Sequence, residues 1–346
     1  MELTRRRFMG LAAATGAAVG AGAMISGGPA YAADSVTVAA DGSGNYTTVQ
    51  AAVNAAPSGR TSAFTINIKP GTYREVVTVP TTKPFLTFHG TGTSSTQTVI
   101  VNNHAAGATA PGGGTYGTFG SATVFVYGHD FQASNLTISN DFDEASSSLT
   151  DKQAVALRIE ADRSILNSVR IYGNQDTLLA NGTARMYFRQ CVIQGDVDFI
   201  FGAGTAVFDR CSIVSLNRGS TSNNGYVTAA STPLSKTYGY LFSACTLSSS
   251  AAAKSVYLGR PWHPSGDPNA EAQVVYRECT LGAHIRDDPW TDMSGFSWKN
   301  ARFFEYKNTG SGATVNSNRP QLSDSQAASY TPQKYLAGSD GWNPIF

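Results

Sequence analysis

Charged side chains are scarce in this chain, and neither sign gathers into a block. They make up 14% of the 346 residues, and 25 Lys and Arg against 24 Asp and Glu leave a formal net charge of +1. Binding of nucleic acid through a basic surface needs a cluster that is missing here. The charge-rich 3.6-residue pattern of a helix bundle is missing too. The abundant Gly, Ser, Thr and Asn favour short strands and turns.

Several catalytic signatures are absent as well. No Gly-x-Ser-x-Gly motif occurs, which disfavours a serine hydrolase built on that strand-to-helix elbow. The five histidines lack the spacing of metal ligands, and no phosphate-binding glycine loop or dinucleotide motif stands out. Other side chains must therefore supply any catalytic chemistry.

Long apolar runs are confined to the N-terminus. Three arginines at residues 5–7 precede an Ala/Gly-rich run to about residue 25, and Ala-Tyr-Ala follows at 30–32. This order predicts an export signal of twin-arginine type over residues 1–32, followed by one domain over 33–346 in a secreted bacterial protein. The alternatives are an ordinary secretory signal or a membrane anchor, although the run is shorter than a typical span. Without the signal the formal charge is −1.

A short pattern recurs through the middle of the chain: apolar, two residues, apolar, one residue, apolar. Successive copies start 33, 22, 20, 34 and 34 residues apart. β-rich units at steps near 20 residues, lengthened by insertions, predict an all-β solenoid, with a parallel β-helix as the best fit. A sandwich with coincidental spacing is the alternative. The copies are Ala133-Leu136-Ile138, Leu166-Val169-Ile171, Phe188-Cys191-Ile193, Phe208-Cys211-Ile213, Phe242-Cys245-Leu247 and Tyr276-Cys279-Leu281.

Two segments outside the repeat read as helical. Residues 49–56, stopped by Pro57 and Gly59, predict a short helix that caps the open N-terminal end of the solenoid. Beyond Arg302 the chain becomes polar and irregular, with a short helical pattern at 323–329. We expect this tail to pack along the outside of the coils.

All four cysteines occupy one position of the repeat and should form an inward column. Neighbouring strands lie about 4.8 Å apart, within reach of a disulfide. We expect a Cys191–Cys211 bridge, because no long insertion separates this pair, whereas Cys245–Cys279 is a weaker candidate. Four small buried apolar side chains are the alternative.

Two aspartates recur at the period of the repeat. Asp176 and Asp198 are 22 positions apart, as are Leu166 and Phe188 in the copies before them. Adjacent coils would place the two carboxylates about 5 Å apart, close enough to oppose joint ionisation and split their pKa values. Arg260 is a candidate for holding the anionic partner and lowering its pKa.

Two glutamines follow the same spacing. Gln175 precedes Asp176, and Gln153 lies 22 positions before Gln175. Amide donors beside a carboxylate nucleophile suit the oxyanion of acyl transfer or ester hydrolysis. A ladder that only stabilises the turns is the alternative.

Five short motifs follow one another along the chain. They are Gly-Thr-Tyr-Arg-Glu at 71–75, Gln-Ala-Val-Ala-Leu at 153–157, Gly-Asn-Gln-Asp-Thr-Leu at 173–178, Asp-Phe-Ile-Phe-Gly at 198–202 and Leu-Gly-Arg-Pro-Trp at 258–262. In these motifs and in their order the chain resembles the pectin methylesterase (pectinesterase) family, from about residue 34 to the C-terminus.

The resemblance implies a right-handed parallel β-helix that hydrolyses methyl esters of polygalacturonate without metal or organic cofactor. Asp198 would be the nucleophile, Asp176 the proton donor and then the base, and Arg260 the residue that orients Asp198. Gln153 and Gln175 would stabilise the oxyanion.

The resemblance also implies which residues contact the polymer. Trp262 would stack on a sugar ring, Val197 and Phe199 would line the cleft beside the nucleophile, and a small set of more distant residues would add contacts. That set is Thr118, Phe119 and, more weakly, Met293. The partner would be methyl-esterified homogalacturonan, with no nucleic acid, no membrane after signal removal, and a monomeric enzyme.

Two other functions remain open at this point. A pectin depolymerase, either a polygalacturonase or a lyase, could use the same fold, although an inverting glycosidase separates its carboxylates by roughly 6.5–9.5 Å. A carbohydrate-binding solenoid without catalysis would use the same cleft.

Overall fold

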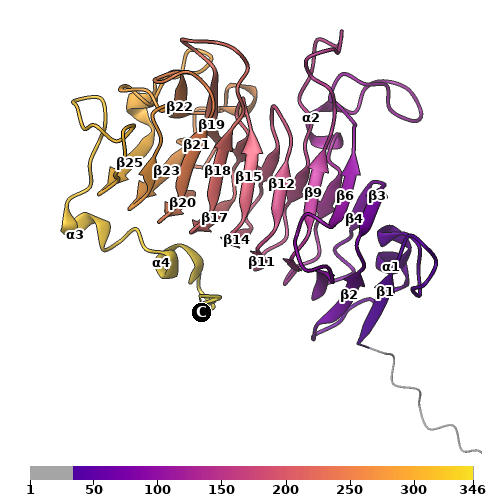
Figure 1. Ribbon diagram of the computed structural model, residues 1–346. Coiled ribbons are helices and arrows are strands. Elements are labelled where there is room, and N and C mark those ends of the chain that lie inside the picture. The colour runs from indigo at the N-terminus through magenta and orange to yellow at the C-terminus, as the bar shows by residue number, and fades with distance from the viewer. Residues whose placement is uncertain (1–33, 346) are drawn as a thin grey trace, which may run out of the picture. The chain divides into compact units, whose positions relative to one another are not determined.

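The computed structural model describes residues 34–345. A stack of β-coils forms one compact unit that contains all of these residues. The predicted export signal, residues 1–32, lies outside the described residues. Figure 1 shows the coils following one another along the described unit, from indigo to yellow. No helix among the described residues has the length and apolar character needed to cross a membrane.

Each coil contributes strands to three parallel sheets. The ten-stranded sheet contains β1 (Ser35–Val38), β2 (Phe64–Ile68), β5 (Leu86–Gly90), β8 (Gln132–Ser134), β11 (Ser164–Asn167), β14 (Arg185–Arg189), β17 (Thr205–Asp209), β20 (Tyr240–Ser243), β23 (Gln273–Arg277) and β25 (Arg302–Tyr306). The eight-stranded sheet contains β3 (Gly71–Arg74), β6 (Thr98–Asn102), β9 (Thr137–Asn140), β12 (Arg170–Tyr172), β15 (Val192–Gly195), β18 (Ser212–Ser215), β21 (Thr246–Ser249) and β24 (Thr280–Leu281). The seven-stranded sheet contains β4 (Val77–Val79), β7 (Val124–Val126), β10 (Leu157–Ile159), β13 (Leu178–Ala180), β16 (Ile200–Gly202), β19 (Gly225–Ala230) and β22 (Val256–Gly259). The prediction of a parallel β-helix is confirmed.

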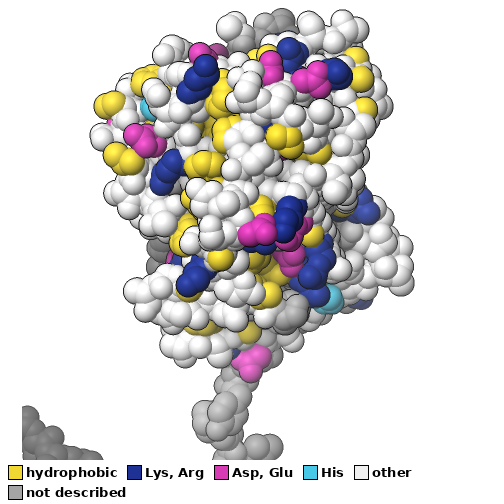
Figure 2. All heavy atoms as spheres, turned by 90° about the vertical axis from the view of Figure 1, so that its left-hand side faces the viewer, with side chains coloured by type: hydrophobic (Ala, Val, Ile, Leu, Met, Phe, Trp, Pro, Cys, Tyr) yellow, Lys and Arg dark blue, Asp and Glu magenta, His cyan; other side chains and the backbone are white. Residues whose placement is uncertain are grey.

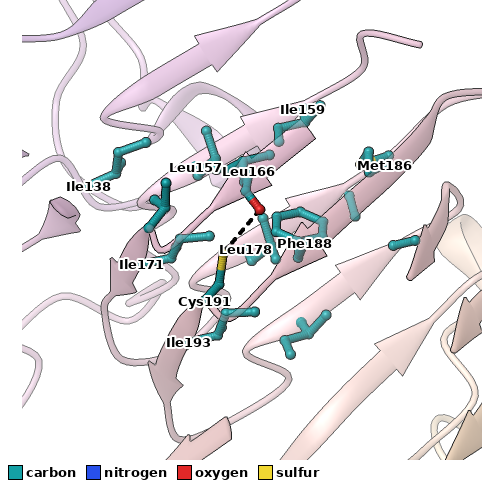
Figure 3. Packing of buried hydrophobic residues seen from close by; sticks show 14 of the residues in the cluster. Ile138, Leu157, Ile159, Leu166, Ile171, Leu178, Met186, Phe188, Cys191 and Ile193 are labelled. Atoms are coloured by element: carbon teal, nitrogen blue, oxygen red, sulfur yellow. Dashed lines mark hydrogen bonds between the residues drawn. The ribbon is translucent and has the colours of Figure 1, made fainter. Parts of the chain in front are cut away.

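The apolar repeat sets the register between coils. Leu166 pairs with Phe188 and Phe188 with Phe208, so equivalent positions of the motif are direct neighbours. The column continues through Phe242 and Tyr276, with ring centroids 4.8, 4.5 and 4.3 Å apart from Phe188 onward. Figure 3 shows this interior close up, with side chains of several coils pointing toward one another. Because a slip by one residue would turn apolar side chains outward, the buried column holds the register.

The two-residue gap in the motif is a sharp turn from the ten-stranded to the eight-stranded sheet. Its second residue adopts a left-handed conformation in coil after coil, with φ near +50°. None of these residues is glycine: they are Asn135, Ser168, Gln190, Arg210, Ala244 and Glu278. Stacked coils therefore impose a backbone conformation that the residue types alone do not favour.

The N-terminal end of the stack is covered by the predicted helix. Helix α1 spans Val49–Ala55, and Val49, Ala52 and Val53 join the main core. Both oxygens of Glu75 accept from backbone N–H groups at its start, those of Val49 and Gln50. The Gly-Thr-Tyr-Arg-Glu segment thus has a structural role, since it satisfies donors that a helix N-terminus leaves open.

The C-terminal tail packs on the outside, as expected. It carries helices α3 (Asp324–Ala327) and α4 (Pro332–Leu336), which lie near the ten-stranded sheet in Figure 1. Tyr335 and Leu336 join a second core with residues on the outer face of that sheet, including Tyr187 and Leu241. Three further short helices are α2 (Gly117–Gly120), η1 (Pro264–Gly266) and η2 (Trp298–Asn300).

Figure 2 shows one face of the unit, on which acidic and basic side chains lie among many uncharged ones. Their interspersion over this face agrees with the even charge balance of the sequence.

The cysteine column exists, but the expected Cys191–Cys211 disulfide is wrong: all four cysteines are free and buried. Each thiol donates to a carbonyl of the preceding coil. Cys191 Sγ donates to Leu166 O at 3.4 Å (Figure 3), and Cys211 Sγ donates to Phe188 O at 3.4 Å. The sulfurs of neighbouring coils therefore point the same way. In-register Cβ atoms are about one strand spacing apart, ~4.8 Å, whereas a disulfide needs about 3.8 Å.

This geometry predicts that all four cysteines are present as free thiols. Denaturation without reductant in the presence of iodoacetamide should add four labels to the protein, one for each free thiol. Intact-mass spectrometry measures the number, and a reduced sample is the control. Two labels without reductant and four with it would contradict the free column.

Candidate active site

The two aspartates occupy the same corner of neighbouring coils, just before strands β13 and β16. These strands pair Leu178 with Ile200, and the backbone N–H of Asp176 donates to Val197 O at 3.0 Å. Both aspartates have positive φ, +64° for Asp176 and +51° for Asp198. The spacing of 22 residues therefore brings them to adjacent positions in the stack, as predicted. Asp tolerates this backbone conformation better than most residues do.

The two glutamines are also brought together by the stack. The N–H of Ala154 donates to Gln175 O at 3.1 Å, which aligns Gln153 with Gln175. One residue further into the sheet the register shifts, because Thr177 O accepts from both Ala156 and Leu157. Leu157 then pairs with Leu178, at a step of 21 rather than 22 residues. This bulge belongs to the class of irregularity often found beside active sites.

The side chains meet in a cleft of about 370 Å³ on the outer side of the seven-stranded sheet. All five predicted catalytic residues line it, and so do four of the six residues predicted to contact substrate. Phe201 and Ala229, for which no contact with substrate was predicted, complete the lining. The predicted residues that line the cleft are Asp176, Asp198, Gln153, Gln175, Arg260, Trp262, Thr118, Phe119 and Met293.

The predictions for Phe199 and Val197 are not supported. Phe199 is fully buried and belongs to the main core, so its expected contact with substrate is wrong. The chain turns at Asp198, and as a result Phe199 and Ile200 both point inward, while Phe201 faces out beside Leu179. Val197 is 8% exposed and does not line the cleft.

Arg260 holds Asp198 through two hydrogen bonds. Its Nε donates to Oδ1 at 2.8 Å and its Nη2 to Oδ2 at 2.6 Å. Arg260 follows β22, which is separated from β16 only by β19 in the seven-stranded sheet. The pair is the bidentate geometry predicted from the sequence, and it fixes the plane of the carboxylate.

Burial decides the direction of both pKa shifts. It raises the pKa of Asp198 above its ordinary value, although the hydrogen bonds and charge of Arg260 act to lower it. Arg260 thus acts to lower the pKa of Asp198, as expected, but desolvation outweighs the ion pair and the net shift is upward.

Asp176 is shifted further in the same direction. Burial raises its pKa well above the ordinary value, the charge of Asp198 raises it again, and Arg260 offsets part of the rise. Asp196 and Glu144 add smaller contributions that raise the pKa of Asp176. The two carboxyl groups thus differ in acidity, with Asp176 the better holder of a proton.

Aromatic side chains form the apolar wall of the cleft. Trp262 lies 5.7 Å from Phe201 and 6.4 Å from Phe119 between ring centroids. Phe119 is 44% exposed, and Arg158 Nη1 donates to its backbone carbonyl at 2.7 Å. Aromatic faces of this kind suit the apolar faces of sugar rings.

In residues 34–345, no three acidic, histidine or cysteine side chains are arranged to hold a metal ion.

Comparison with known proteins identifies the family. The model of the family described as Pectinesterase matches residues 35–339. The chain is 39% identical over 333 residues to Pectinesterase A of Dickeya dadantii (strain 3937), covering 86% of this chain and 88% of that protein. It is 35% identical over 310 residues to Pectinesterase 31 of Arabidopsis thaliana, covering 87% and 92%.

Solved structures agree with these sequence matches. Pectin methylesterase PemA from Erwinia chrysanthemi superimposes with a TM-score of 0.83 at 38% identity, covering 90% of this chain and 98% of that one. A pectin methylesterase in complex with a hexasaccharide gives a TM-score of 0.81 at 38% identity, with the same coverage. The chain therefore belongs to the pectinesterase family and is a carboxylic ester hydrolase.

Proposed function

We propose that the protein removes methyl groups from methyl-esterified polygalacturonate, with Asp198 as the nucleophile and Asp176 as the acid and base. The observation that carries the proposal is the pair of stacked carboxyl groups, of which only Asp198 is held by a bidentate arginine. The aromatic wall beside them and the hexasaccharide complex of a related pectin methylesterase support a polysaccharide substrate. We further propose that the protein acts as an exported monomer.

The first half of the reaction forms an acyl-enzyme. A carboxylate oxygen of Asp198 attacks the C6 carbonyl carbon of the ester, and the carbonyl oxygen becomes an oxyanion. Amide N–H groups of Gln153 and Gln175 stabilise this oxyanion. The C–O bond to the methoxy group then breaks, Asp176 donates its proton to the leaving oxygen, and methanol departs from a mixed anhydride on Asp198.

The second half releases the acid product. Asp176, now a carboxylate, removes a proton from a water molecule, whose oxygen attacks the C6 carbonyl carbon. The bond to Asp198 breaks, and Asp198 leaves as a carboxylate held by Arg260. The galacturonic acid loses its proton to solvent, and Asp176 is again protonated. The high pKa of Asp176 and the ion pair of Asp198 support this division of roles.

One assay tests the reaction class. The purified protein, incubated with highly methylated pectin, should release methanol while reducing ends and unsaturated products stay at background. New chain ends without methanol would instead indicate a depolymerase, and binding without any product would indicate a carbohydrate-binding module.

Replacement of the nucleophile should abolish turnover. Asp198→Asn keeps the shape of the side chain but cannot form the anhydride, so methanol release should fall by at least about 10⁴-fold. Asp287→Asn, which changes an exposed carboxylate paired with Lys254, is the matched control. Appreciable residual activity in a folded Asp198→Asn protein would refute this role.

Arg260→Lys tests whether Asp198 needs the planar guanidinium group with its two parallel N–H donors. We expect kcat to fall about 10²-fold, because a single ammonium group cannot make both hydrogen bonds to Asp198. Arg163 holds Asp130 with the same two-point geometry elsewhere, at 2.8 and 2.6 Å. Because this pair lies outside the cleft, Arg163→Lys should leave kcat unchanged. Near-normal rates in both variants would refute the proposed role of Arg260 in orienting Asp198.

The buried carboxyl group of Asp196, next to the site, should make the free energy of unfolding depend on pH. Burial raises its pKa to about 6, so the folded protein holds a proton there between roughly pH 4 and 6 that the unfolded chain has lost. Stability then falls as pH rises through this window and stays reduced above it. Asp196→Asn should match the parent near pH 4 and exceed it by about 1–3 kcal/mol at pH 7–8.

Urea unfolding of both proteins across this pH range measures the difference. Asp287→Asn again serves as the control, since its carboxylate is exposed. A stability gap that stays constant with pH would show that Asp196 does not titrate as described.

A further inference from the structure

The guanidinium of Arg260 has a third contact, which the reaction scheme leaves unused. Its Cζ lies 3.8 Å from the centroid of the Tyr226 ring, compared with 5.4 Å for Arg158 over Phe119. The two hydrogen bonds to Asp198 use the edge of the guanidinium, where its N–H groups point. The ring therefore adds a contact of another kind, of the cation–π type.

Tyr226 is itself held in place from two directions. It is the second residue of β19 and pairs in register with Tyr257 of β22, so that the two rings stack at 5.2 Å. Its hydroxyl accepts a hydrogen bond from Asn223 Nδ2 at 2.9 Å. Arg286 lies over Tyr257 at 4.6 Å and extends the stack. The ring that contacts Arg260 is thus part of a supported surface.

The substrate gives this contact a purpose. Demethylation leaves carboxylates along the polymer, and a guanidinium is a two-point partner for any carboxylate. A product carboxylate near the cleft could compete with Asp198 for Arg260, which is only partly buried. A long arginine side chain held by Asp198 alone would be free to swing toward it, whereas a ring packed on the guanidinium restrains that motion.

We propose that Tyr226 is a positioning residue, whose ring keeps Arg260 on Asp198 and prevents its capture by carboxylates of the demethylated polymer. This inference rests on the proposed function, because it assumes that Asp198 reacts and that the product is anionic. Tyr226 itself need not touch the reacting atoms.

Kinetics of three variants test the proposal. Tyr226→Leu removes the ring and should lower kcat about tenfold with little change in KM, and inhibition by added polygalacturonate should strengthen several-fold. Tyr226→Phe keeps the ring and should stay within about twofold of the parent in both measures. Tyr257→Leu removes the stacked partner, while the hydrogen bond from Asn223 still holds Tyr226 against Arg260, and this variant is the matched control for packing.

A second readout does not depend on catalysis. The Arg260 Nε–H resonance, assigned by its loss in Arg260→Lys, should exchange with solvent faster in Tyr226→Leu than in the parent, Tyr226→Phe or Tyr257→Leu. If the parent released no methanol, the proposed function would fail, while this exchange measurement would still report whether the ring restrains Arg260.

Two results would overturn the inference. A folded Tyr226→Leu protein with parental kcat, product inhibition and Nε–H exchange would show that the ring restrains nothing. A loss in Tyr226→Phe equal to that in Tyr226→Leu would assign the effect to the hydroxyl instead. Should Tyr226→Leu fail to fold, Tyr226→Met, which keeps most of the volume without a ring, takes its place with the same expected outcomes.

Discussion

In-register stacking of parallel coils is the constraint on which the rest of the structure depends. Backbone hydrogen bonds join each strand to its equivalents one coil away, and the buried aromatic column keeps them from slipping. Residues far apart in sequence thereby become neighbours, such as Asp198 and Arg260, which are 62 positions apart. The active site needs no loop of its own to bring its acids together, because the repeat does so.

The same stacking creates unequal acids at a cost in stability. Two carboxyl groups lie buried one coil apart, and each sits on a residue with positive φ. Backbone strain of this kind costs on the order of 1–3 kcal/mol per residue, and burial of carboxyl groups adds to it. The apolar interior of the neighbouring coils stabilises the fold enough to hold them there. The result is a site in which Asp176 retains a proton, while Arg260 favours the anionic form of Asp198.

Features that follow from periodicity could be predicted from the sequence. The apolar motif predicted the pairing of Leu166 with Phe188, and the spacing of the aspartates and glutamines predicted their adjacency. The predictions failed where the answer depends on the direction of a side chain. The turn at Asp198 sends Phe199 inward and Phe201 outward, against simple alternation along a strand. The thiols share one position of the repeat, but each donates in the same direction, to a carbonyl of the preceding coil, instead of bonding to another sulfur. The contact of Tyr226 with Arg260 depends on two separate strands and leaves no pattern in the sequence.

The central claim is that adjacency in the stack, together with burial, makes Asp176 the group that holds the proton. The most direct measurement is a ¹³C NMR titration of the aspartate carboxyl groups, with Asp176 assigned by its loss in Asp176→Asn. The account predicts that Asp176 titrates well above an ordinary aspartate, and that its pKa falls in Asp198→Asn, where the neighbouring negative charge is gone. An Asp176 that titrates at the ordinary value, or whose pKa does not respond to Asp198→Asn, would contradict it.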